Sequence, residues 1–140
     1  SSIIIGAFVS GMDAGKIYNS WPLMGTTFFP NDNNLNNLFE ITAFSDPSLV
    51  QFMHRNLAYL ILVLYLVILF FIISKKLVKF NKIILFLGLI LLVQIILGIL
   101  TIKSGAQMFI ASMHQISSIF LVSFSVYFLF INNKKINLQP

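Results

Sequence analysis

The sequence predicts an all-α integral membrane protein with three complete membrane-spanning helices and the end of a fourth. Of its 140 residues, 58% are hydrophobic and 9% are charged, whereas a soluble domain carries about a quarter charged residues. Three stretches, 56–74, 83–102 and 104–133, contain no Asp, Glu, Lys or Arg. Each can provide the roughly 20 residues that a helix needs to cross a bilayer. The apolar runs are continuous, not alternating, which favours helices over the strands of a membrane barrel.

We expect the complete spans near 52–74, 82–102 and 108–131, with residues 1–10 forming the end of an earlier helix. The chain opens with Ser1, inside an apolar run that is too short to span alone. We therefore interpret its start as a cut point in a longer or split protein. The absence of cysteine excludes disulfides, Cys-ligated zinc and iron–sulfur clusters within the chain. The net charge of +5 comes from basic residues that flank apolar runs, so we expect a lipid bilayer as partner and no nucleic acid.

The charged residues give the spans an orientation. Lysines occupy the turn after the first complete span and follow the last one: Lys75, Lys76, Lys79, Lys82, Lys134 and Lys135. All acidic residues lie in the segment 11–50: Asp13, Asp32, Glu40 and Asp46. The positive-inside rule predicts that the 11–50 loop lies outside and that the 132–140 tail lies on the cytoplasmic or matrix side. Both a bacterial cell membrane and a mitochondrial inner membrane have this sidedness. Trp and Tyr residues in the long loop predict that it lies partly on the membrane surface.

The two histidines occupy matching positions on two parallel spans. His54 is 21 residues before Lys75, and His114 is 20 residues before Lys134, so each lies about 30 Å from the inner edge. Two imidazoles at one membrane depth can bind a metal between them. Two histidines without a third ligand suit haem, whose porphyrin leaves two axial positions, whereas zinc needs three or four protein ligands. The alternative is that each histidine only forms hydrogen bonds at the membrane interface.

Other polar residues are candidates for cofactor contacts. Two interpretations fit Arg55 and Lys103: pairing with a haem propionate, or anchoring in lipid headgroups. Gln94, Gly98 and Thr101 share one stripe of the middle span, where small residues admit a macrocycle or a neighbouring helix. Gln94 is also polar at mid-membrane and needs a hydrogen-bond partner. A further small-residue face after the second histidine suits either a haem ring or helix packing: Ser117, Ser118, Leu121 and Ser125. No motif assigns a catalytic residue.

Four segments resemble a known family. GAFVSGMDAGKIYNSWPLMG (6–25) resembles the loop after the fifth helix of haem A synthase, and VQFMHRNLAYL (50–60) resembles the start of its sixth helix. QIILGILT (94–101) and ASMHQISS (111–118) are similar to parts of its seventh and eighth helices. The resemblance covers essentially the whole chain and is strongest to the mitochondrial and proteobacterial form. Met53 departs from the pattern, since relatives often carry a polar or acidic residue there.

The resemblance implies an eight-helix enzyme built from two pseudo-symmetric four-helix halves. This chain would be the C-terminal half, with its first helix truncated. The family oxidises the C8 methyl of haem O to the formyl group of haem A. The resemblance implies a haem b held between His54 and His114. We add Arg55 and Gln94 as further candidate cofactor-binding residues because of their own positions in the sequence. This haem would relay electrons, while the N-terminal half would hold the substrate haem O. Further partners to be expected are a haem O synthase and a second copy of the chain.

Two other functions stay open at this point. A b-type cytochrome subunit for membrane electron transfer would share the bis-histidine site but should lack the 6–25 motif. A non-haem helical membrane protein for assembly or transport would carry the histidines for structural reasons alone.

Overall fold

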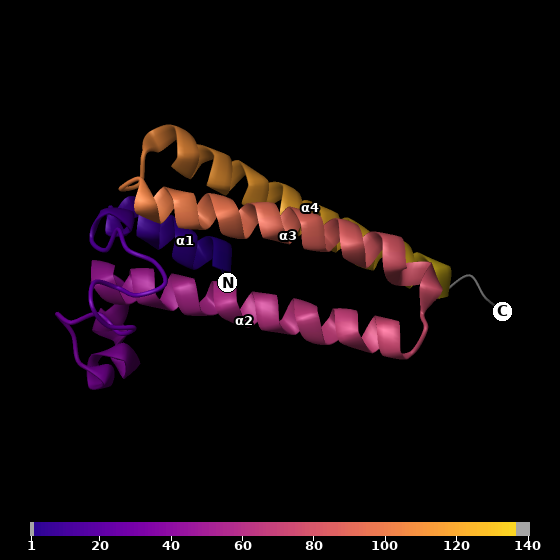
Figure 1. Cartoon of the computed structure of the whole chain (residues 1–140), viewed down its shortest axis with the longest axis horizontal. Helices are drawn as coiled ribbons and strands as arrows, with labels where there is room; N and C mark the ends of the chain where they lie inside the picture. Colours follow the sequence, from indigo (N-terminus) through magenta and orange to yellow (C-terminus); the bar gives the residue numbers. More distant parts are fainter. Residues whose placement is uncertain (1, 137–140) are drawn as a thin grey trace.

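Four α-helices run along one common axis in the part of the chain that is described (Figure 1). The computed structural model describes residues 2–136, without the side chains of 79 and 131–136. The helices are α1 (Ser2–Gly11), α2 (Pro47–Ser74), α3 (Val78–Lys103) and α4 (Met108–Ile136). Three stretches are long and apolar enough to cross a membrane: Pro47–Ser74, Phe80–Lys103 and Met108–Phe130. Apart from one isolated bridge, the described residues form no β-structure. The predicted all-α membrane fold is confirmed.

The long helices extend beyond the spans expected at 52–74, 82–102 and 108–131. α2 begins at Pro47 because Asp46 caps it: one carboxylate oxygen accepts from the N–H groups of Ser48 and Leu49, at 2.9 and 3.0 Å. Proline suits this first helical position because its missing N–H would have no intrahelical partner. α4 continues through residues 132–136 of the expected tail, which contain no glycine or proline to end a helix. Residues 137–140 of that tail lie outside the described residues.

The helix order makes α2 and α4 parallel, with α3 antiparallel between them in the chain (Figure 1). α1 packs against α2, and α4 packs against α3. A contact far from the loop ties α2 to α3, where the hydroxyl of Tyr65 donates to the carbonyl of Ile84 at 3.0 Å. Gly88 faces the same hydroxyl so closely that a Cβ atom there would clash with it. The glycine therefore makes room for the tyrosine between the two helices.

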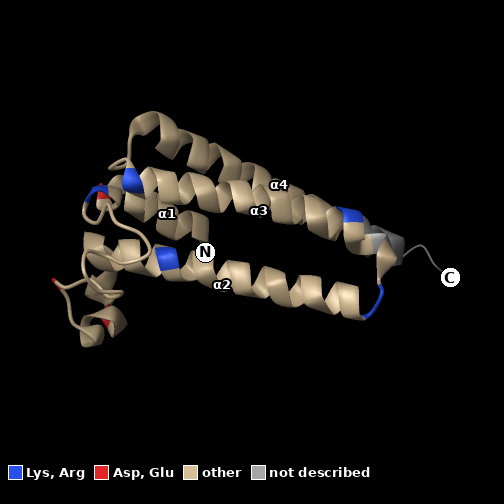
Figure 2. Ribbon diagram, in the orientation of Figure 1, with Lys and Arg blue, Asp and Glu red and all other residues tan. Residues whose placement is uncertain are grey.

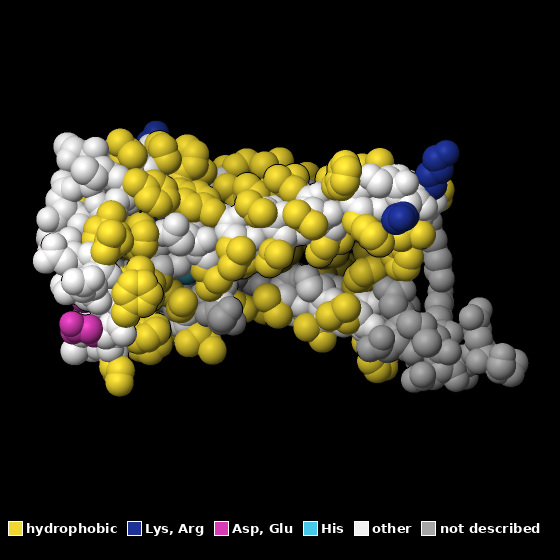
Figure 3. All heavy atoms as spheres, turned by 90° about the horizontal axis from the view of Figure 1, so that it is seen from below, with side chains coloured by type: hydrophobic (Ala, Val, Ile, Leu, Met, Phe, Trp, Pro, Cys, Tyr) yellow, Lys and Arg dark blue, Asp and Glu magenta, His cyan; other side chains and the backbone are white. Residues whose placement is uncertain are grey.

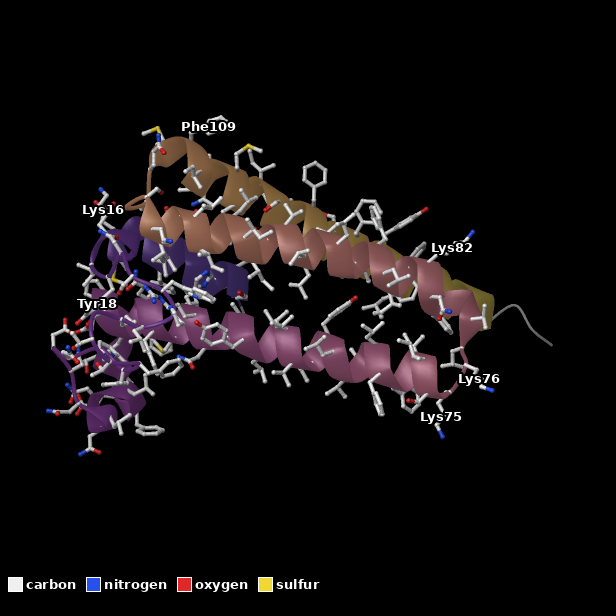
Figure 4. All side chains as sticks on the ribbon, in the orientation of Figure 1. Lys16, Tyr18, Lys75, Lys76, Lys82 and Phe109 are labelled. Carbon is white, nitrogen blue, oxygen red and sulfur yellow. The ribbon has the colours of Figure 1, made fainter. Side chains whose placement is uncertain are left out.

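Charged and apolar groups are separated along the bundle axis. The acidic residues lie at the loop end, while Lys75, Lys76 and Lys82 lie at the opposite end (Figures 2 and 4). Between the two ends, hydrophobic side chains cover the visible face of the helices (Figure 3). Phe70 is 73% exposed and Leu129 is 61% exposed. Such large apolar side chains would be costly in water but match the hydrocarbon core of a bilayer.

The segment between α1 and α2 is an ordered cover at one end of the bundle. It contains three short 3₁₀ turns: η1 (Ala14–Lys16), η2 (Leu35–Phe39) and η3 (Ile41–Ser45). The Tyr18 hydroxyl donates to Asp32 at 2.9 Å, and burial together with this bond raises the pKa of Tyr18. In the Asn-rich stretch 31–37, the Asn33 amide donates to Asp46 and Ser48, at 3.1 and 2.8 Å. The stretch thus ties the loop to the start of α2.

The Asp46 cap yields a stability prediction. Burial opposes ionisation of this carboxylate, but hydrogen bonds from Ser48, Leu49 and Asn33 prevail and hold its pKa below 3.8. A depressed pKa means that the carboxylate stabilises the fold above its unfolded-state pKa and loses this contribution as pH falls through its folded-state pKa. Asp46→Ala should cost about 1 kcal/mol, the usual value of an N-cap. Thermal unfolding in detergent, followed from neutral pH to about pH 3, measures both effects.

Glu40→Ala is the matched control for this measurement, since the Glu40 side chain bonds only to the Thr42 hydroxyl at 3.0 Å among the described residues. An Asp46→Ala variant that unfolds at the same temperature as Glu40→Ala at neutral pH would contradict the capping role.

Candidate functional site

The structure brings the two histidines together from two different helices. His54 projects from α2 and His114 from α4, and their ring centroids lie 6.4 Å apart. The ring planes cross at 90°. Both rings are half-buried, and the Nδ1 atom of each is buried without a hydrogen-bond partner among the described residues. Unpaired buried imidazole nitrogens are costly, which makes this pair a candidate ligand site.

The spacing of the rings fits one metal ion between them. Two metal–imidazole bonds of about 2 Å each, together with the radii of two five-membered rings, account for the 6.4 Å centroid distance. No three His, Cys, Asp or Glu side chains gather within the described part of the chain. The pair therefore fits an axially ligated haem better than zinc, which needs more protein ligands.

Each imidazole lies against a glycine of a neighbouring helix. A Cβ atom at Gly6 of α1 would be 3.3 Å from Cε1 of His54. A Cβ atom at Gly98 of α3 would be 3.0 Å from Cε1 of His114. The two glycines therefore provide the space in which the rings sit. The sequence singled out Gly98 as a small residue on a helix stripe, whereas it gave Gly6 no role beyond its place in the 6–25 segment.

Gln94 finds its hydrogen-bond partners around the second histidine. Its amide nitrogen donates to the backbone carbonyl of His114 at 3.2 Å and lies 3.5 Å from Nε2 of the same residue. Its amide oxygen accepts from the Ser117 hydroxyl. Gln94 thus connects α3 to α4 beside the ring. Thr101, on the same stripe, instead donates to the Leu97 carbonyl of its own helix at 2.8 Å.

Arg55 is buried beneath the loop. The residue is only 5% exposed. The Nη1 atom donates to the carbonyls of Ser20 and Leu23, at 2.9 and 3.3 Å, and Nη2 donates to the carbonyl of Tyr18 at 2.9 Å. These bonds hold the guanidinium inside the protein, away from the lipid headgroups that were one of its two expected partners. Lys103, by contrast, is exposed at the loop end of α3.

Gln51 adds a second hydrogen bond between the start of α2 and the loop that Arg55 binds. No prediction from the sequence singled it out. It precedes Arg55 by one helical turn and is 2% exposed. Its amide nitrogen donates to the Tyr18 carbonyl at 3.1 Å, the same carbonyl that Arg55 binds. Tyr18 lies at the loop end of the bundle (Figure 4). The spacing of four residues between two polar side chains at the start of an apolar helix was the available indication.

Aromatic side chains complete the attachment of the loop to α2. Phe28 lies 5.9 Å from Phe52 and 6.4 Å from Tyr59, and Phe29 lies 4.9 Å from Phe52, measured between ring centroids. Such pairs are each worth about 0.5–1.5 kcal/mol beyond their buried area. Met53, the residue that departs from the family pattern, lines a shallow apolar groove between α1, η2 and α2.

The fold and site define a class: a helical membrane protein with a paired-histidine site between parallel spans, beneath an ordered loop. Comparison with known sequences gives the family. Residues 1–126 match the model of the COX15-CtaA family, described as cytochrome oxidase assembly protein, and the chain belongs to this family.

Curated relatives are named heme A synthase. The chain is 46% identical to a heme A synthase of Pelagibacter ubique over 121 residues, which cover 86% of this chain and 35% of the relative. It is 40% identical to a heme A synthase of Rickettsia prowazekii over 133 residues, which cover 94% of this chain and 40% of the relative. The chain thus spans well under half the length of these relatives. No solved structure matches it.

The glycine contacts yield a prediction about the histidine site. Gly98→Ala would place a methyl group 3.0 Å from Cε1 of His114, and the ring must then shift or α3 must move away from α4. We expect severalfold less haem per protein in the purified variant, measured by absorbance. Gly11→Ala is the control, because nothing lies within 4 Å of its added Cβ. Equal haem content in both variants would show that Gly98 does not shape the site.

Proposed function

We propose that this chain is the haem-holding part of a haem A synthase, with one haem b ligated axially by His54 and His114. The observation that carries the proposal is the 6.4 Å separation of the two imidazole rings on parallel helices. Membership of the cytochrome oxidase assembly family and the names of the relatives support it. The proposed class is therefore a membrane oxidoreductase of haem A biosynthesis.

The residues of the site suit electron transfer. Bound there, a haem supplies a one-electron redox centre. His54 of α2 and His114 of α4 would be the residues that hold it, and a haem held by two histidines would supply electron transfer, not oxygen binding. Gln94 fixes the backbone of His114, and Gly6 and Gly98 leave room for the rings. These side chains, all among the described residues, would thus hold and orient that redox centre.

The oxidation of haem O then belongs to the remaining part of the full-length protein. We propose that the C8 methyl of haem O is oxidised in that remaining part, and that the chain described here carries the electrons away. The relatives are bacterial, so we place the chain in a bacterial inner membrane. The 11–50 loop faces outward and the C-terminus inward, as the segregation of lysine and acidic residues predicts. A haem O synthase and a second copy of the chain stay predicted partners.

Arg55 and Gln94 remain predicted cofactor contacts with different support. Gln94 already bonds to the ligand histidine's backbone. Arg55 uses both Nη atoms on loop carbonyls, and its buried Nε atom has no partner among the described residues. A propionate contact would therefore use this Nε.

A b-type cytochrome subunit is the second candidate, because the histidine geometry alone serves it equally well. The two functions differ in whether the full-length protein converts haem O. The names of the relatives favour the synthase.

The ligand assignment has a direct spectroscopic test. The purified protein should show a Soret band and sharp α and β bands on reduction, as expected for low-spin haem. His54→Ala and His114→Ala should each abolish or alter this spectrum, because each removes one axial ligand. Met53→Leu and Met113→Leu change the preceding residues and should leave it unaltered. A colourless wild-type protein, or two histidine variants with an unchanged low-spin spectrum, refutes the proposal.

The division of labour has its own test. The purified chain, supplied with haem O, oxygen and an electron acceptor, should form no haem A by chromatography. A full-length relative assayed in parallel is the positive control. Haem A formed by the chain alone would overturn the assignment of the methyl oxidation to the rest of the protein.

A further inference from the structure

We propose that Arg55 is a fixed positive charge that raises the reduction potential of the haem held by His54 and His114. The inference rests on the proposed function and extends it, because it assigns the loop a part in setting the redox poise. It concerns the charge of Arg55 and not a contact between Arg55 and iron.

The first observation is that no acidic side chain among the described residues pairs with the buried charge of Arg55. Arg55 directly follows His54 and is 5% exposed. Its hydrogen-bond acceptors are three neutral backbone carbonyls. Among the described residues it forms no ion pair; the ion pair found there joins Lys16 to Asp13. The other acidic side chains bond elsewhere: Asp32 to Tyr18, Glu40 to Thr42, and Asp46 to Asn33 and Ser48.

The second observation is that the loop is built to hold this charge in place. A buried guanidinium is tolerated only when its N–H groups are hydrogen-bonded. The Ser20 hydroxyl donates to the Leu23 carbonyl at 2.8 Å and accepts from the N–H of Gly25 at 2.9 Å. This turn presents two of the three carbonyls to the planar fork of Arg55. The position of the charge relative to His54 is thereby fixed.

The consequence for a haem follows from charge alone. Ferric haem with two neutral imidazoles carries one more positive charge than ferrous haem, and its reduction takes up one electron without making or breaking a bond. A nearby cation disfavours the ferric state. At an effective dielectric constant of about 20, Coulomb's law gives about a tenfold change in the reduction equilibrium for any cation roughly 12 Å from the iron. For a one-electron couple this is about 59 mV.

Three substitutions separate the charge from the hydrogen bonds. Arg55→Gln removes the charge and retains one amide donor. Arg55→Lys retains the charge and loses the planar fork. Gln51→Leu removes one bond to the Tyr18 carbonyl and leaves the charge untouched. The measurement is a potentiometric titration of the reduced α band of the purified full chain in detergent.

Arg55→Gln should lower the reduction potential of the haem, by an amount that corresponds to about a tenfold smaller equilibrium constant for reduction. The potentials of Arg55→Lys and Gln51→Leu should stay near that of the wild type. An unchanged potential in Arg55→Gln overturns the inference. An equal fall in Arg55→Lys and Arg55→Gln also overturns it, because the cause would then be loop geometry. If Arg55→Gln binds no haem, Arg55→Met takes its place as the neutral variant; loss of haem from both assigns Arg55 to haem retention and overturns the inference. A colourless wild type would instead refute the proposed function itself.

Discussion

The constraint on which the structure depends is that a chain in a bilayer must satisfy its backbone hydrogen bonds internally. It forces the apolar segments into helices, and the two short connections then make α2 and α4 parallel. Because α2 and α4 are parallel, the similar spacings from His54 to Lys75 and from His114 to Lys134 place the two histidines at a similar depth. The facing imidazoles, 6.4 Å apart, are thus a result of chain topology before they are a result of side-chain packing.

The first turns of α2 serve two purposes at once. His54 points toward α4, while Gln51 and Arg55, on another face of the same helix, hold the loop. The helix begins early enough to provide both faces because Asp46 caps it ahead of the apolar run. The first turns of α2 therefore hold both His54 and the loop between α1 and α2 in place. Displacing the loop would also disturb the environment of the ligand.

Sequence alone predicted the spans and the matching depth of the histidines, because the bilayer sets both the apolar length of a span and the side on which its flanking lysines lie. It could not predict the hydrogen-bond acceptors of Arg55, since these are backbone carbonyls, which every residue has whatever its type. Gly6 escaped notice for a similar reason: the ring that it faces comes from a helix more than forty residues away in the chain. Asp46 and Pro47 indicate the early start of α2, because a carboxylate cap and a proline are typical of the start of a helix.

The hydrogen bond between Tyr65 and the Ile84 carbonyl, beside Gly88, has a consequence for alignment. A helix in lipid meets little resistance to sliding along its axis, because one apolar surface replaces another. A slip of one turn would move the Tyr65 ring away from Gly88, the residue that leaves room for it. Tyr65 therefore fixes the position of α2 along α3, and the bond from Gln94 of α3 to His114 of α4 extends this alignment to the second histidine.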